Sequence, residues 1–434
     1  MKKRVVGIFF ALVLCLTMVP ISAFAEQKTT IRTVDQLLQF AKAVDNGEYD
    51  DKTDAVVSLE ADLDLKDVKT WTPIGSRFAA DGTLLHYFSG KFYGNGHTIS
   101  NLDFSENYGK TEYPSFGFFS EVYDAEISGL TIQGKLDVSN SGYVYFGTVA
   151  GVAADSKISG CVSDVSFTDT DKYINGTVAL CGYAIDSTIE YCQNKGNFSI
   201  TKDVSSLQMG GIVGLAQNST VQYCANTGDM TSWTPHTGGI VGELYQDSKI
   251  INCYSTGKMV PFGNGTTDFG GIAGTVGADT EIRHCYFAGE INLSQYTATT
   301  PYKRLGGIAG EVSSDTPAFE NNYFVKTENV PACFKYQNAG TKKTLEYMKT
   351  EDFFNEITAA DGKYRFNSNG TPLLPEHKYP TVEETPRYYY NSTTTVKDEG
   401  KTGSPKTIDA GVGVYAVSVV LSLTGMVYVG KKKP

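Results

Sequence analysis

The chain has 434 residues, of which 20% are charged, and its formal net charge is −11. A surface with this excess of acidic groups repels nucleic-acid phosphates and anionic lipid headgroups, which excludes both as general partners. The chain also contains 45 glycines, 27 tyrosines and 23 phenylalanines. This composition is typical of many short strands joined by tight turns.

Residues 1–25 have the pattern of a secretory signal peptide. Three basic residues near the start are followed by an apolar run from Val5 to Ile21, and the segment ends in Ala23-Phe24-Ala25. A basic start, an apolar middle and an Ala-x-Ala ending are the three parts of such a signal. An uncleaved anchor helix is the alternative, but Pro20 and the Ala-x-Ala ending favour cleavage.

Residues 26–50 predict a helix that caps one end of the fold. Thr33 and Gln36 have the spacing of a capping box, and Asn46-Gly47 supplies a stop signal. The apolar residues between them recur at helical spacing: Val34, Leu37, Leu38, Ala41 and Val44. Such a helix can cover the open end of a stack of repeats.

Residues 51–340 contain an internal repeat. A Gly-Gly-Ile-(Val/Ala)-Gly string occurs four times, and looser versions end at Gly151 and Gly182. The four strings lie at 210–214, 238–242, 270–274 and 306–310. The final glycines are 31, 32, 28, 32 and 36 residues apart along the chain. A period of this length indicates a solenoid, in which each repeat forms one unit.

One repeat position is occupied by cysteine in five units: Cys161, Cys192, Cys224, Cys253 and Cys285. Leu130 has the equivalent place one unit earlier, and leucine replaces neither a disulfide partner nor a metal ligand. We therefore interpret the five cysteines as a structural ladder of buried thiols. Cys181 and Cys333 lie outside this ladder, so a disulfide stays open for them.

The repeat predicts an all-β fold, a right-handed parallel β-helix. Each unit has β-branched residues between Gly and Asx residues and too little apolar surface to fold alone. Stacking places equivalent residues ~4.8 Å apart and pairs the backbones of successive turns. We expect a C-terminal cap over residues 341–379, including a helix between Leu345 and Ile357, because an uncovered last turn leaves a bare strand edge.

The C-terminal residues predict a membrane anchor. Residues 380–409 form a polar, flexible stalk, residues 410–430 are an uncharged apolar run long enough to span a bilayer, and 431–434 form a basic cytoplasmic tail. The stalk ends in Ser404, Pro405, Lys406 and Thr407. This order of motif, apolar span and basic tail resembles the cell-wall sorting signal of Gram-positive bacteria, which implies attachment to peptidoglycan by a sortase. Ile408 stands where that family has glycine, so retention in the plasma membrane is the alternative.

The repeats resemble the GLUG-motif surface proteins of bacteria. The likeness rests on the Gly-Gly-Ile-Val-Gly strings with a downstream Cys-x-x-x-Gly, and on Trp71-Thr-Pro-Ile-Gly75 and the stretch from Phe88 to Leu102. It covers roughly residues 30–375. The resemblance implies a parallel β-helix on the cell surface, with an adhesin-like role. Peptidase domains accompany such modules in some relatives, and the sequence has no recognisable domain of that kind.

The sequence gives no sign of catalytic chemistry. One exposed repeat position holds Ser159, Glu190, Gln222, Ile251 and Arg283 in successive units. That face lacks the pair of neighbouring carboxylates that glycoside hydrolysis requires. Asp62, Asp64 and Asp67 have no EF-hand spacing and fit a solvated strand face better than a metal site. No zinc motif, phosphate loop or nucleophile elbow is present, so we expect no enzyme activity, cofactor or metal.

The segments before each Gly-Gly string have the character of a binding site. They contain aromatic and polar residues that would form a strip ~15 Å long over four turns: Trp233, His236, Phe262, Asp268, Tyr296, Tyr302 and Arg304. Packing of these residues on their own turns is the alternative. The leading hypothesis is a non-catalytic surface protein that binds a host or environmental glycan or a matrix protein. A polysaccharide lyase or hydrolase and a passive spacer are the alternatives.

Overall fold

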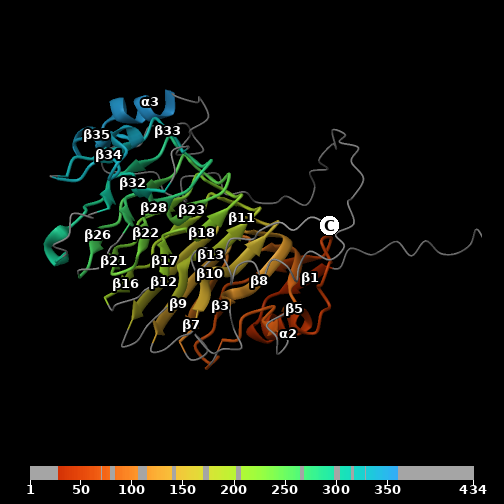
Figure 1. The fold of residues 1–434 in the computed structure, drawn as a ribbon. Helices are drawn as coiled ribbons and strands as arrows, with labels where there is room; N and C mark the ends of the chain where they lie inside the picture. Colours follow the sequence, from red (N-terminus) through yellow and green to blue (C-terminus); the bar gives the residue numbers. More distant parts are fainter. Residues whose placement is uncertain are drawn as a thin grey trace, which may run out of the picture.

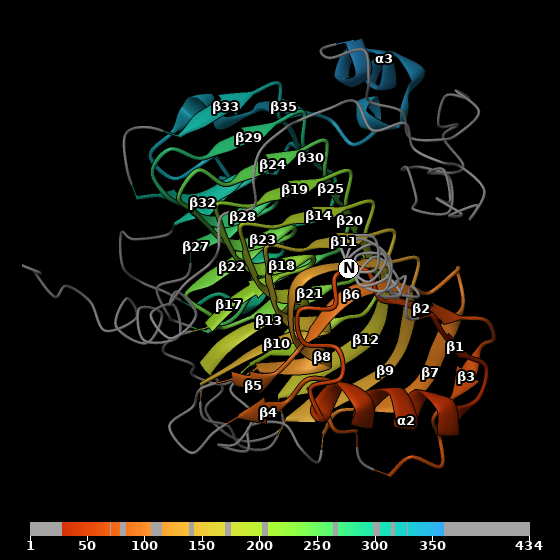
Figure 2. The same cartoon turned by 90° about the vertical axis from the view of Figure 1, so that its right-hand side faces the viewer.

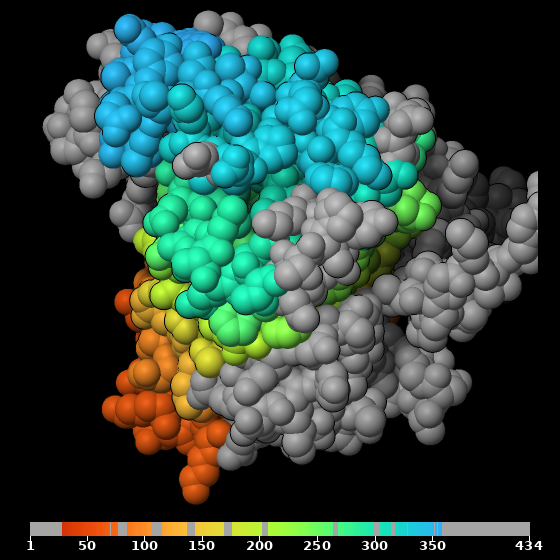
Figure 3. Space-filling model, turned by 60° about the vertical axis from the view of Figure 1, so that its left-hand side comes forward, coloured from red at the N-terminus to blue at the C-terminus, as the bar shows by residue number. Residues whose placement is uncertain are grey.

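The repeats fold into a parallel β-solenoid of about seven turns (Figure 1). The structure, a computed structural model, describes residues 28–359 except for gaps at 70, 79–83, 106–114, 139–142, 170–174, 202–206, 264–267, 298–303, 314–316 and 328. In the space-filling view the turns follow one another along the stack from the N-terminal to the C-terminal end (Figure 3). The fold class predicted from the repeat is therefore confirmed as an all-β parallel solenoid.

One sheet contains the Gly-Gly strings and the strands on either side of them. In chain order, fourteen of its strands are β1 (Lys28–Ile31), β2 (Val56–Leu59), β6 (Phe88–Tyr93), β8 (Ser115–Ser128), β10 (Tyr143–Ala154), β13 (Asn175–Ile185), β17 (Leu207–Gly210), β18 (Val213–Gln217), β22 (His236–Gly238), β23 (Val241–Tyr245), β27 (Asp268–Gly270), β28 (Ala273–Val276), β31 (Leu305–Gly306) and β32 (Ala309–Val312). The same sheet also contains a short strand later in each turn: β11 (Lys157–Ser159), β14 (Thr188–Glu190), β19 (Thr220–Gln222), β24 (Lys249–Ile251), β29 (Glu281–Arg283) and β33 (Ala318–Glu320).

A second parallel sheet closes the other side of the solenoid. Its strands are β3 (Leu63–Asp64), β7 (Thr98–Asp103), β9 (Thr131–Val138), β12 (Val162–Asp169), β15 (Gln193–Asn194), β16 (Phe198–Ile200), β20 (Ala225–Asn226), β21 (Met230–Ser232), β25 (Tyr254–Ser255), β26 (Met259–Pro261), β30 (Tyr286–Phe287), β34 (Tyr323–Val325) and β35 (Thr341–Lys343). A small antiparallel pair, β4 (Arg77–Phe78) and β5 (Leu84–His86), lies outside both sheets.

The repeat register seen in the sequence is the pairing register of the strands. The apolar residue three positions before the cysteine position pairs with its counterpart in the next turn throughout: Ile127, Ile158, Ile189, Val221, Ile250, Ile282 and Phe319. The first six of these side chains are fully buried. Because a one-residue slip would turn every such side chain outward, the buried row maintains the register of the stack.

The five ladder cysteines are free and fully buried. The backbone N–H of Cys192 donates to Cys224 Sγ at 3.4 Å, and the same bond joins Cys224 to Cys253. Beyond the last thiol, the amide oxygen of Asn322 accepts the N–H of Cys285 at 3.0 Å. A thiol here is therefore both an apolar filler and a hydrogen-bond acceptor. Cys181 and Cys333 are also buried and free.

Helix α2 (Val34–Asp45) covers the N-terminal end of the stack (Figure 2). Thr33 caps it by accepting the N–H of Gln36, and the Gln36 side chain accepts the N–H of Arg32. The buried face differs from the expected set, because Phe40 is buried and Leu38 is 41% exposed. Strand β1 also pairs with β2, so the solenoid begins before the expected residue 51.

The C-terminal end is organised differently from the expected cap. Val330, Ala332, Cys333 and Ala339 join the main core, so residues 329–340 cover the last turn. Helix α3 (Glu351–Ala359) begins later than the expected Leu345 and belongs to a separate apolar cluster on the outer face of the second sheet.

Aromatic side chains account for the position of α3, because Phe353 makes edge-to-face contacts with Tyr286 at 5.6 Å and Tyr323 at 5.4 Å between ring centroids. Short 3₁₀ segments occur at η1 (Leu293–Gln295), η2 (Gln337–Ala339) and η3 (Tyr347–Lys349).

Candidate functional site

Three aromatic residues of the predicted strip meet at one corner of the solenoid; we call Trp233, Phe262 and Tyr296 the aromatic corner. Trp233 follows β21 and Phe262 follows β26, in paired register, with ring centroids 6.2 Å apart. Gly263 forms an isolated bridge with Tyr296 of the next turn. All three rings are half-buried. The corner thus presents aromatic surface on three successive turns.

Gly263 makes the packing of this corner possible. Its φ is +77°, a conformation that L-residues with a side chain rarely adopt. A Cβ at this position would also clash with the indole ring of Trp233. The Trp233 ring therefore rests against the backbone of the following turn, which fixes its orientation.

The polar residues of the strip lie apart from the rings, on the sheet that contains the Gly-Gly strings. Gln208, His236 and Asp268 pair in register on β17, β22 and β27, and Arg304 continues the series one turn later. We call these four residues the polar row. The structure thus divides the predicted strip into an aromatic corner and a polar row on the same turns, whereas Tyr302 lies outside the described residues.

A second row faces the polar row and consists of Glu243, Thr275 and Glu311, which pair in register on β23, β28 and β32. The chain bends at each Gly-Gly string, so outward side chains of the strands before and after it converge. Gly242 shows how close the strands come, because a Cβ there would lie 2.9 Å from the backbone nitrogen of Met209. We call this second set the facing row.

Ion pairs and hydrogen bonds join the two rows. His236 Nδ1 lies 2.7 Å from Thr275 Oγ1 and 3.2 Å from Asp268 Oδ2. Thr275 donates to Asp268 Oδ2 at 2.8 Å, and Arg304 pairs with Asp268 at 3.1 Å and also with Glu311. The side chain of Asp268 is only 4% exposed, and its negative charge is offset by Arg304 and by His236.

The protonation of His236 reflects this surrounding charge. Burial by itself would lower the pKa of His236, because it disfavours the imidazolium form. The hydrogen bond to Asp268 and the negative charge of Glu243 outweigh that effect and raise the pKa above its ordinary value. The imidazole side chain is 26% exposed, so it can still meet a ligand.

Sequence reasoning missed Gln208 and the facing row, although their positions follow a rule. Each polar-row residue stands two positions before the first glycine of a string, and each facing-row residue directly follows the last glycine. In the preceding turns the facing-row position holds Tyr183 and Leu215. Earlier still, the same position holds Val152 and the carboxylate of Glu121. After three uncharged turns, a charged group returns with Glu243, on the turns that also contain the aromatic corner.

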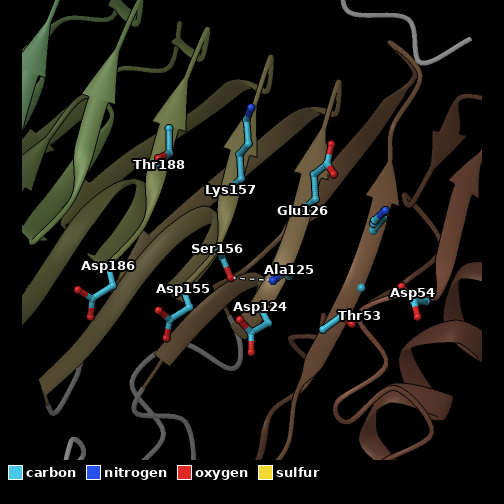
Figure 4. Close-up of a pocket in the computed structure, with 12 residues that line it drawn as sticks. Thr53, Asp54, Asp124, Ala125, Glu126, Asp155, Ser156, Lys157, Asp186 and Thr188 are labelled. Carbon is cyan, nitrogen blue, oxygen red and sulfur yellow. Dashed lines mark hydrogen bonds between the residues drawn. The ribbon is translucent and has the colours of Figure 1, made fainter. Parts of the chain in front are cut away.

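A separate groove of about 590 Å³ crosses the first turns of the stack (Figure 4). Asp124, Asp155 and Asp186 line one edge, one from each turn, all with positive φ near 47°. Burial and the charges of the two neighbouring aspartates raise the pKa of Asp155. Opposite them lie Glu126 and Lys157, and Lys157 pairs with Glu190 of the next turn at 2.8 Å. The groove is polar and has no aromatic lining.

Other sequence candidates have local partners. Asp62 accepts hydrogen bonds from the backbone of Thr98 at 2.9 Å and from His97 at 3.0 Å. Glu190, the carboxylate of the repeat position considered for catalysis, is buried rather than exposed and accepts a hydrogen bond from Gln222 at 2.8 Å. Within the part of the chain that the structure describes, no group of three or more His, Cys, Asp or Glu side chains is arranged to hold a metal ion.

The expected targeting segments lie outside the described residues. This applies to the signal peptide at 1–25, the stalk at 380–409 with Ser404 to Thr407, the apolar span at 410–430 and the tail at 431–434. Among the helices of the described residues, none is both long enough and apolar enough to cross a membrane.

Comparison with known proteins identifies a GLUG motif in the chain. The family model of the GLUG motif matches residues 235–259, which run from β22 to β26 and include Cys253. Among solved structures, the chain is similar to one described as a putative immunoglobulin A1 protease from Bacteroides ovatus, with 17% identity and a TM-score of 0.48. That similarity covers 80% of this chain and 91% of the other. No curated protein matches the sequence. The chain thus contains a GLUG motif within its β-solenoid.

Proposed function

We propose that this chain is a non-catalytic binding protein of the cell surface that holds an extended glycan along the aromatic corner and the polar row. One observation supports this above all others: the half-buried rings and the charged side chains occur on the same turns of the solenoid. In the two turns before Glu243 the equivalent positions hold uncharged residues such as Thr177 and Leu215.

The chemistry of the two features suits a sugar chain. Aromatic faces pack against the apolar face of a pyranose ring, and neighbouring polar groups set its orientation by hydrogen bonds. His236 and Arg304 are 26% and 31% exposed, so a ligand on the corner can reach both side chains. Turns ~4.8 Å apart offer repeated contacts to a polymer that lies along the stack.

Display outside the cell is part of the same proposal. It rests on the signal-peptide pattern of residues 1–25 and on the apolar span with its basic tail at the other end. The motif from Ser404 to Thr407 supports attachment to the wall of a Gram-positive cell. Mass spectrometry of protein released from the wall tests this step, because sortase cleavage leaves Thr407 as the C-terminal residue, whereas any other end contradicts it.

The binding proposal is tested with the full chain on arrays of glycans and matrix proteins. The double variant Trp233→Ala, Tyr296→Ala is expected to lose at least tenfold in affinity for the glycan bound by the parent protein. Tyr245→Ala is the matched control, because Tyr245 is an aromatic residue at the end of β23, outside the aromatic corner, and is 43% exposed. Equal binding by the double variant and the control contradicts the proposed site.

A panel of soluble polysaccharides separates the remaining alternatives. Release of reducing ends or unsaturated products would replace the binding role by a lyase or hydrolase activity. If the protein binds nothing on the arrays and releases no product from the panel, the passive spacer is the alternative that remains. Circular dichroism of each variant, with the β-sheet signal of the parent, shows that a lost interaction is not a lost fold.

A further inference from the structure

The pair formed by Glu243 and Gln208 has hydrogen-bond acceptors in excess of donors. Gln208 Nε2 donates to Glu243 Oε2 at 3.2 Å, which is the one hydrogen bond to this carboxylate among the described residues. Gln208 is only 3% exposed, and its Oε1 atom has no hydrogen-bond partner. Because that Gln208 atom is buried, a donor from outside can reach only the half-buried carboxylate of Glu243.

The other carboxylates of the two rows are already satisfied. Asp268 is bonded to His236, Thr275 and Arg304, and Glu311 is paired with Arg304. Among the described residues, Glu243 forms no ion pair with a lysine or arginine, although its charge acts on His236. The negative charge that no lysine or arginine of the described residues offsets is therefore concentrated at Glu243, beside the imidazole of His236.

The position of this charge connects it with the aromatic corner. Gln208 pairs in register with His236, which lies three residues after Trp233. Three residues of extended chain span at most ~10 Å, about the length of two sugar units. One ligand can therefore contact the rings and Glu243 together.

We propose that the ligand of this surface is a glycan with free amino groups, whose ammonium group pairs with the half-buried carboxylate of Glu243. This inference rests on the proposed function and specifies its ligand. An anionic sugar, such as a uronate, is disfavoured because it would meet Glu243 without a free cation beside it. A neutral N-acetylated sugar retains the aromatic contact but lacks the ion pair.

The test compares two oligosaccharides that differ at one group. The full chain is titrated with a hexamer of β-1,4-linked glucosamine and with the fully N-acetylated hexamer at low ionic strength and pH 6, where the amines are protonated. Hydrogen bonds to a charged group predict that the glucosamine hexamer binds about tenfold more tightly or better. Added salt is expected to reduce this preference, since it screens an exposed ion pair.

Glu243→Gln is the diagnostic variant, since it removes the charge and retains the side-chain shape. It is expected to abolish the preference for the glucosamine hexamer and to leave binding of the acetylated hexamer unchanged. Glu290→Gln is the control, because Glu290 has a side chain that is 62% exposed on the other sheet. The parent protein's preference is expected to persist in this control.

The outcomes separate this inference from the proposed function. Equal affinity of the parent protein for the two hexamers, or an unchanged preference in Glu243→Gln, overturns the amino-glycan assignment. Binding to neither hexamer also overturns it. With either result, the proposed function still holds if the glycan array identifies another sugar whose binding depends on Trp233. It is contradicted only if the array shows no binding as well.

Discussion

Truncation of one ladder thiol, Cys224→Ala, is expected to destabilise the solenoid by about 2–4 kcal/mol. The thiol of Cys224 accepts the N–H of Cys192 at 3.4 Å and donates to the carbonyl of Gln222 at 3.2 Å. Removal of the sulfur leaves a buried N–H without an acceptor, which costs about 1–3 kcal/mol. The lost burial of one heavy atom adds about 1 kcal/mol.

Cys181→Ala is the matched control for this prediction. Cys181 is equally buried, and its thiol donates to the carbonyl of Tyr183 at 3.6 Å, but it accepts no backbone N–H from any residue that the structure describes. Its truncation is therefore expected to cost only the burial term, about 1 kcal/mol. Cys224→Ser, which restores an acceptor, is expected to recover part of the loss.

Urea unfolding of the full chain, followed by circular dichroism, measures these differences as shifts in the transition midpoint at a constant slope. If Cys224→Ala and Cys181→Ala lose the same free energy of unfolding, the ladder thiols act as fillers alone. The hydrogen-bonding part of the argument would then be wrong.

Two further predictions concern the corner and α3. Gly263→Ala is expected to lower the thermal midpoint of unfolding by several degrees more than Gly96→Ala and to change tryptophan fluorescence. Both glycines have positive φ, but only Gly263 touches Trp233. Equal midpoints for the two variants would contradict this contact. Burial raises the pKa of Glu356, but bonds from Lys343 and Tyr347, both at 2.8 Å, outweigh it and lower the pKa. The lowered pKa means that Glu356 stabilises α3 above pH ~4.5 and that this contribution disappears as pH falls through the folded-state pKa. Amide hydrogen exchange in α3 is the measurement, and we expect it at pH 3 to be faster than the intrinsic exchange rates explain. Glu356→Gln is expected to lose the same protection of α3 amides at pH 7.

Much of the fold could be predicted because neighbouring turns of a solenoid see almost the same environment. Ile127 and Ile158 recur at the same place in consecutive units, and they pair because stacking places like residues over like. The capping-box spacing at Thr33 likewise predicts where α2 begins, since the signal lies within four residues. The expected helix between Leu345 and Ile357 overlaps α3, but its packing could not be predicted, because it depends on Tyr286 and Tyr323, which lie far from it in sequence.

The candidate site shows the same division. The repeat, the ladder of thiols and the residues of the strip could be predicted from the chain alone, since each depends on spacing along it. The contacts of Asp268 with His236 and Arg304, and of Glu243 with Gln208, could not, because they form between different turns of the folded chain. The physical reason is the bend at each Gly-Gly string: alternation along a strand tells which side chains point outward, but the bend turns two outward rows toward each other across successive turns.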